Sequence, residues 1–201
     1  MPENIIKYGL KNVHYAKATY DSKTEKYKYD APVRIPGAVN LSMSSKATID
    51  NFYADDGIYA TINSNPGYEG SAEFALLPES FKKDVLGEEG ASGITLENSD
   101  ALVSDFALLF EFKGDKKKTR HIFYRTSCTR PDIAGQTTEE KNSPQTEKLN
   151  LTAAKRLNDG YIHASVAEGT SLYDDWYTAV TEPEAIKAIT DAASVAASVG
   201  E

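Results

Sequence analysis

The sequence predicts a mainly β protein, an antiparallel β-sandwich or barrel with one short flanking α-helix and a helical C-terminal segment. Two observations favour this class. Apolar and polar residues alternate in many short segments, as they do in strands with one buried face. Helical spacing of apolar residues occurs in only two places. The chain has 201 residues, which is enough for one domain with a sizeable core.

Period-two alternation defines the predicted strands. In 105–112, for example, one strand face is apolar and the opposite face contains Asp105, Ala107 and Glu111; the apolar face consists of Phe106, Leu108, Phe110 and Phe112. Each such strand is expected to have one buried and one solvent-facing side. The predicted strands are 38–46, 58–63, 67–77, 105–112, 119–127 and 146–152.

The connections between these strands differ in character. Segment 113–118, KGDKKK, joins two strong strands and predicts an exposed basic hairpin tip. Segments 20–31 and 130–145 are polar and lack periodicity, which predicts two long loops. The glycine-rich segment 87–93 contains two glutamates and no following Lys-Ser or Lys-Thr, so we expect a flexible loop there and no phosphate site.

Two segments have helical spacing. In 78–87, Phe81 and Val85 lie four residues apart and Gly87 is placed to end the helix in a left-handed conformation. In 181–199, Thr181 and Glu184 fit a capping box ahead of an alanine-rich stretch. These patterns predict a domain over 1–180 and a C-terminal helical extension over 181–201.

Charge is unevenly distributed along a chain whose net charge is -8. The net charges of 1–49, 50–111, 112–160 and 161–201 are +4, -11, +5 and -6. This alternation is compatible with ordinary surface variation. It is also compatible with complementary faces that meet between copies of the chain, and such head-to-tail contacts build rings or filaments.

The residues of catalytic and metal chemistry are sparse, so we predict no catalytic site, no metal site and no cofactor. We interpret the acidic pairs 55–56 and 174–175 as solvated turn residues. Adjacent residues in a strand point to opposite faces, so the two carboxylates of a pair would not converge on one catalytic site. His121 reads as a surface or partly buried histidine. Cys128 is the only cysteine; Arg125 and Arg130 nearby could lower its pKa, but a small buried apolar side chain is the more ordinary reading.

Nucleic-acid gripping and membrane insertion are also disfavoured. Lys116, Lys117, Lys118 and Arg120 form a basic cluster near aromatic residues, yet those aromatics fit the buried period of a strand equally well. The N-terminus lacks the pattern of a secretory signal, and no apolar run is long enough to span a bilayer.

Tyrosine is unusually frequent, with 12 residues against 7 Phe and 1 Trp. Tyrosine suits interfaces because one end of its ring is apolar and the other forms hydrogen bonds. The early tyrosines fit either edge strands of a β domain or an arm that contacts another subunit. They are Tyr8, Tyr15, Tyr20, Tyr27 and Tyr29.

Several long segments, in the same order, resemble the major tail tube protein of long-tailed siphophages that infect Gram-positive bacteria. Together they cover about residues 3–180, and their number and order make the resemblance specific. The segments are NIIKYGLKNVHYAKAT, APVRIPGAVNLSMS, NFYADDGIYATINSNPGYEGSAEFALLPESFKKDVLG, FALLFEFKGDKKKTRHIFYRTSCTRP, GQTTEEK and WYTAV.

This resemblance implies a structural protein of the virion tail, assembled in the host cytoplasm, and not an enzyme. Family members form hexameric rings that stack head-to-tail into a tube for DNA ejection. The partners implied are further copies of the chain and the tape measure, distal tail and tail terminator proteins. DNA would pass through the lumen without being gripped, and no membrane would be involved.

Within that family reading, acidic residues on polar strand faces are candidates to line the lumen, because an acidic wall repels DNA. The candidates are Glu69, Glu73, Asp105 and Glu111. Candidates for ring stacking come from the loop 20–31, the tip 113–118 and the loop 130–145. They are Lys116, Lys117, Lys118, Tyr27 and Tyr29.

Two other readings remain open. One is a carbohydrate- or protein-binding β-sandwich, such as an adhesin or baseplate component, with Trp176 and Tyr177 as a platform; these two aromatics fit a structural anchor better. The other is an enzyme, disfavoured because no acid and base residues converge. A contractile or secretion-type tube would share the fold, but the quoted segments point away from it.

Overall fold

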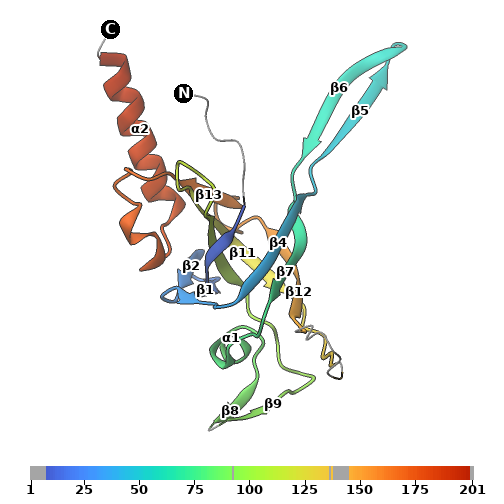
Figure 1. Cartoon of the computed structure of the whole chain (residues 1–201). Coiled ribbons are helices and arrows are strands. Elements are labelled where there is room, and N and C mark those ends of the chain that lie inside the picture. Colours follow the sequence, from blue (N-terminus) through green and yellow to red (C-terminus); the bar gives the residue numbers. More distant parts are fainter. Residues whose placement is uncertain (1–7, 92, 136, 138–144, 200–201) are drawn as a thin grey trace.

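The computed structural model describes residues 8–91, 93–135, 137 and 145–199. It is mainly β and antiparallel, as predicted, with a short helix and a C-terminal helix (Figure 1). The strands are β1 (Leu10–Asp21), β2 (Lys26–Tyr29), β3 (Val33–Arg34), β4 (Ala38–Ser45), β5 (Thr48–Ala54), β6 (Gly57–Ser64), β7 (Gly67–Phe74), β8 (Glu89–Ala91), β9 (Ile94–Leu96), β10 (Phe106–Phe112), β11 (Arg120–Cys128), β12 (Glu147–Ala154) and β13 (His163–Val166). The helices are α1 (Glu79–Asp84), the 3₁₀ helix η1 (Asp174–Tyr177) and α2 (Pro183–Val199).

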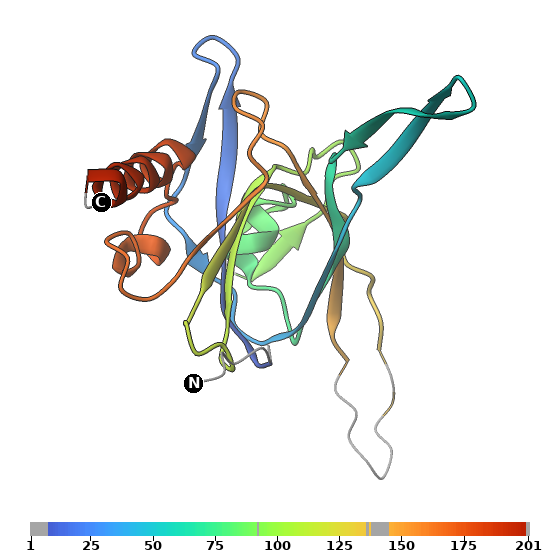
Figure 2. The same cartoon turned by 90° about the horizontal axis from the view of Figure 1, so that it is seen from above.

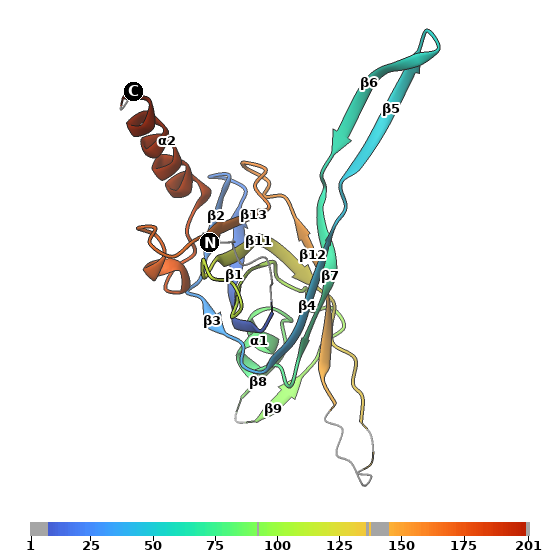
Figure 3. The ribbon, with the colours of Figure 1, turned by 45° about the horizontal axis from the view of Figure 1, so that its top comes forward.

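The main sheet has the order β2-β1-β10-β11-β12-β7-β4, with β3 paired to β1 and β13 paired to β11. Strand β11 divides its partners: Arg120–Phe123 pair with β13, whereas Arg125–Cys128 pair with β12. The sheet therefore turns at β11, and β12, β7 and β4 form a second layer facing β1 and β10 (Figure 3).

The core between the two layers is apolar and closed at one end by α1. Phe81 of α1 is fully buried and packs edge-to-face against Tyr15 and Phe106. Gly87, after the helix, has φ +70°, the left-handed conformation predicted for it. A helix of six residues is held mainly by this packing, because short isolated helices are unstable in water.

A second apolar cluster lies on the other side of β10 and β11. It is covered by η1 and by the start of α2, which lie to one side of the sandwich in Figure 2. Trp176 of η1 is 1% exposed, and its indole N–H donates to the His121 carbonyl at 3.5 Å. Consequently β10 is buried on both faces, and the prediction that it has one solvent-facing side is wrong.

Predicted and observed elements agree for all six strands, both helices and the basic tip 113–118, with end differences of a few residues. Two predicted loops are wrong. Part of 20–31 is strand, because Tyr20 and Asp21 complete β1 and pair with β2 across a short turn. Within 87–93, residues 89–91 form strand β8, which pairs with β9. Most of the second half of 130–145 lies outside the described residues.

Candidate assembly surface

The β5–β6 hairpin extends away from the sandwich as a two-stranded ribbon (Figures 1 and 3). All eight residues of β6 and six of the seven of β5 are exposed. Several are large and apolar, with exposed fractions between 57% and 71%: Ile49, Phe52, Tyr53, Ile58, Tyr59 and Ile62. The prediction that strand 58–63 has a buried face is wrong for the isolated chain.

Local chemistry explains why this segment forms a ribbon. Asp55 and Asp56 both have positive φ, 51° and 59°, and precede Gly57, as in a type I′ turn. Asn51 accepts a hydrogen bond from Thr61 across the strands at 3.1 Å, and the Phe52 and Tyr59 rings pack edge-to-face. The acidic pair 55–56 is thus a turn pair, as predicted.

A ribbon of this kind is marginally stable alone in water. With about 3.3 Å per residue, its seven-residue arm reaches about 23 Å beyond the sandwich. It exposes apolar side chains on a strand pair that nothing else in the described part of the chain covers. The ribbon is therefore an unusually exposed apolar element of the described structure.

The outward face of β4, β7 and β12 is polar. Its three rows are Asn40, Ser42 and Ser44 on β4, Glu69, Ser71 and Glu73 on β7, and Lys148, Asn150 and Thr152 on β12, in register with one another. Strand β4 ends the sheet order, so its outer edge is available for pairing.

The two glutamates of this face are balanced by lysines. Glu69 lies 2.6 Å from the Lys46 ammonium, and Glu73 is paired in register with Lys148. Glu73 also accepts a hydrogen bond from the Thr146 hydroxyl. The face is therefore hydrophilic with its charges matched, and is not the strongly acidic surface that the sequence suggests.

Asp105 and Glu111 do not share this face. Asp105 lies just before β10 and pairs with Arg125 at 2.8 Å. Glu111 is 4% exposed and lies within 3.2 Å of Lys11 and Arg120. Burial opposes ionisation of Glu111, but its hydrogen bonds from Lys11, Asn12 and Arg120 prevail and lower its pKa. The expectation that Glu111 projects from a solvent-facing strand side is wrong.

Other parts of the same chain cover the aromatic side chains of Tyr27 and Tyr29. The structure therefore contradicts the expectation that these side chains contact a neighbouring ring of subunits. Tyr27 is 8% exposed, and both rings face the Arg156 guanidinium, with centroids 5.3 and 5.8 Å away. Burial raises the pKa of both phenols. Sequence reasoning missed Arg156, whose role depends on contacts between distant segments.

The basic tip 113–118 is exposed at its lysines, as predicted. Lys118 pairs with Glu168 at 2.5 Å. Asp115 organises the turn by accepting hydrogen bonds from the backbone N–H groups of Lys117 and Thr119. Lys113 and Lys116 are exposed beside them.

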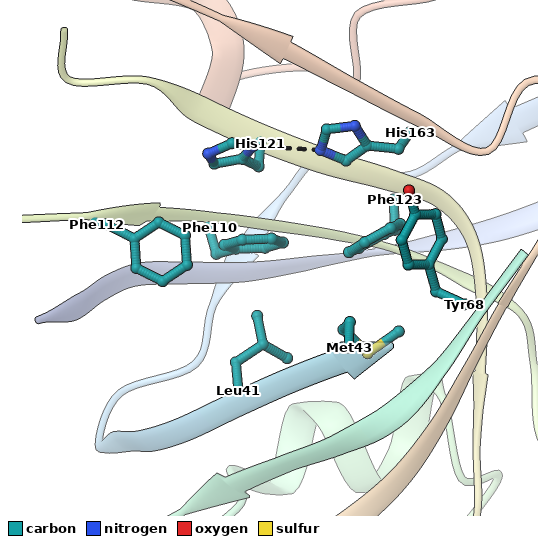
Figure 4. A pocket seen from close by; sticks show the side chains of 8 residues that line it. All are labelled: Leu41, Met43, Tyr68, Phe110, Phe112, His121, Phe123 and His163. Carbon is teal, nitrogen blue, oxygen red and sulfur yellow. Dashed lines mark hydrogen bonds between the residues drawn. The ribbon is translucent and has the colours of Figure 1, made fainter. Parts of the chain in front are cut away.

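A pocket of about 310 Å³ opens between the two layers, where β12 has left the first half of β11 (Figure 4). Its lining is apolar and aromatic: Leu41, Met43, Tyr68, Phe110, Phe112 and Phe123, with His121 and His163. The two histidine rings stack, with 3.2 Å between His121 Nδ1 and His163 Nε2. None of the sequence patterns indicates this pocket, because its walls come from five separate strands.

The remaining sequence candidates are structural. Burial raises the pKa of the Cys128 thiol to about 12, which opposes the thiolate form despite Arg130. Trp176 is buried and Tyr177 packs against His14 and Arg120, so they form an anchor and not an exposed platform. Asp174 and Asp175 begin η1.

Within the described residues, no cluster of three or more metal-binding side chains occurs. In that same part of the chain, no helix combines the length and apolar character needed to cross a membrane. Neither the family models nor the curated proteins contain a match to this chain.

Proposed function

We propose that this chain is a structural protein of a phage tail, which assembles into rings that stack as a tail tube for DNA ejection. The β5–β6 ribbon is the observation that carries this proposal. It is an apolar extension about 23 Å long that no other described part of its own chain covers. The count of six subunits and the passage of DNA come from the family resemblance.

The unlike surfaces at the two ends of the molecule support an assembly that adds copies repeatedly. The free edge of β4 and the ribbon belong to different surfaces from the β8–β9 hairpin and α1, which lie at the opposite end in Figure 1. A contact between unlike surfaces of identical chains is heterologous, and it produces closed rings or open stacks.

The polar face of β4, β7 and β12 is the proposed lumen lining. Its side chains are hydrophilic and matched in charge, with Glu69 paired to Lys46. Such a wall offers DNA phosphates no excess of positive charge to bind, so DNA can slide. Glu69 and Glu73 contribute to this lining, whereas Asp105 and Glu111 hold the sandwich together.

Electron microscopy and light scattering of the purified chain over a range of concentrations test this function. We expect hollow rings or tubes of constant diameter. A variant in which 49–63 is replaced by a short Asn-Gly turn should remain folded and form no tubes. As a matched control, Gly57→Ala leaves the ribbon intact, because nothing lies within 4 Å of the added methyl group. Tubes from the shortened variant would contradict the role of the ribbon.

The pocket favours a second candidate function, a carbohydrate- or protein-binding module. It is concave and aromatic, and its volume lies at the lower end of the range for ligand sites. A chain that stays monomeric while binding a glycan or peptide in this pocket, as followed by fluorescence of its aromatic residues, would support this alternative against the tube.

A further inference from the structure

We propose that the β5–β6 ribbon of one copy docks on a second copy at the pocket between β4 and β11, beside the basic tip 113–118. The inference rests on the proposed function and names the receiving surface for the ribbon. The occupant of the pocket is therefore another copy of this chain.

The ribbon is acidic as well as apolar. Residues 48–64 contain Asp50, Asp55 and Asp56 and no basic residue. The two aspartates of the turn lie at the far end, and Phe52 and Tyr59 form an aromatic pair near it. A receiving site must therefore cover apolar rings and offer positive charge to the turn.

The pocket supplies both properties. Phe110, Phe112 and Phe123 form its walls, together with Leu41 and Met43 from β4. The chain leaves Phe112 directly into the tip, where 113–118 has four lysines and one aspartate. Apolar surface and basic charge thus adjoin at one end of the β10–β11 hairpin.

One other group of exposed apolar side chains, around the β8–β9 hairpin, is in an acidic setting. Ile94, Leu96 and Leu102 are 65%, 63% and 88% exposed. Segment 88–102, which contains them, has four acidic residues and no basic one. Like charges facing one another across an interface are costly, so charge selects the pocket over this surface.

The ribbon of a chain cannot dock in the pocket of that same chain. Figures 1 and 3 show the ribbon directed away from the sandwich, continuous with β4 and β7 at its base. Folding it back on the pocket would break that continuity. The contact is between copies, and since ribbon and pocket are different surfaces, it is of the ring- or stack-forming kind.

Cysteine cross-linking between two differently tagged copies tests the contact. Both copies carry Cys128→Ser; one also carries Phe52→Cys and the other Met43→Cys. After mixing and mild oxidation we expect a disulfide-linked heterodimer that requires both cysteines. Leu102→Cys replaces Met43→Cys in the matched control and should give at least about tenfold less product. Circular dichroism checks that each variant is folded.

Charge reversal provides a second measurement. Asp55→Lys with Asp56→Lys should reduce the heterodimer at least about tenfold, as should Lys113→Glu with Lys116→Glu. Placing one reversed pair on each partner should restore the heterodimer.

Electron microscopy of the same samples distinguishes a failure of the docking site from a failure of the proposed tube function. Tubes without the Met43 cross-link would overturn this docking site alone. Absence of both tubes and cross-link overturns the proposed function as well, and a dominant Leu102 product places the ribbon on the acidic surface.

Discussion

Arg156 Nη1 lies 2.6 Å from Glu182 Oε2, and this pair fixes the start of α2 to the sandwich. Arg156 is 3% exposed and faces the rings of Tyr27, Tyr29 and Tyr124. Burial opposes the charge of the guanidinium, yet Glu182 and Asp159 keep the pKa of Arg156 above its ordinary value. The Tyr124 hydroxyl donates to the Thr181 carbonyl and holds the same segment.

We predict that Glu182→Ala lowers the free energy of unfolding by about 2 kcal/mol. The substitution leaves a buried guanidinium with Asp159 as its remaining ion-pair partner at 3.3 Å. Arg156→Met should lower the free energy of unfolding by less, because the carboxylates of Glu182 and Asp159 can then turn to water. Urea unfolding measures both, with the exposed Glu184→Ala as control. Equal losses for all three variants would contradict this role of the pair.

Acid should destabilise the protein partly through Glu111. Its pKa is lowered from 4.5 in the folded chain. The stabilisation is therefore present above that ordinary value and is lost as the pH falls through the lower folded one. Glu111→Gln should be less stable at neutral pH and should lose less stability between about pH 6 and about pH 3. Urea unfolding across that range tests this, and a loss unchanged from the parent chain would contradict it.

Cys128 should react slowly with thiol reagents in the native protein. Burial raises the pKa of its thiol to about 12, so the thiolate is scarce at neutral pH. We expect modification to be at least about a hundredfold faster in denaturant, where the pKa returns to about 8.5. A native rate close to the denatured rate would show that the thiol is accessible and activated.

Gly70 of β7 has no room for a side chain against the backbone of β4. A methyl group there would lie 1.8 Å from the Ser42 carbonyl oxygen, a backbone atom that cannot turn aside. Gly70→Ala should cost about 2 to 3 kcal/mol and loosen β4 together with the base of the ribbon. Hydrogen exchange of β4 amides measures this. Gly57→Ala is the matched control, and equal protection in the two variants would contradict the prediction.

A basic lumen should hold DNA. Ser42→Lys with Ser71→Lys adds positive charge to paired positions of the polar face. Tubes of this variant should retain duplex DNA in a salt-sensitive way, whereas the parent tubes should not. Ser42→Asn with Ser71→Asn controls for size. Equal DNA retention by both variants would contradict the assignment of this face to the lumen.

The fold was predictable where alternation is strong, as in β4, β7, β10 and β12. Which strand faces are exposed to solvent was less predictable. Strand β10 alternates Phe106, Leu108 and Phe110 with Ala107 and Leu109, and the second set is also buried because η1 and α2 cover it. Glu111 belongs to the same strand, so an acidic residue on the presumed outer face is in fact enclosed.

The candidate site was predictable only in part. The lysines of 113–118 are exposed as the KGDKKK segment indicates. The pocket and the Arg156 cluster depend on strands far apart in the chain, and short-range sequence patterns do not indicate such contacts. The ribbon has the alternation of an ordinary strand at 58–63, and its lack of a covered face comes from its place outside the sandwich.

The exposed ribbon links the energetics of one chain to those of its neighbours. In the proposed assembly its apolar residues leave water only when copies associate, so much of the heat-capacity change of residues 48–64 would belong to association and not to folding of the single chain. Calorimetry of dilute chains would miss that part. In that assembly each ribbon would also lose conformational entropy at the moment of contact, so we expect weak first encounters and growth that depends on a nucleus.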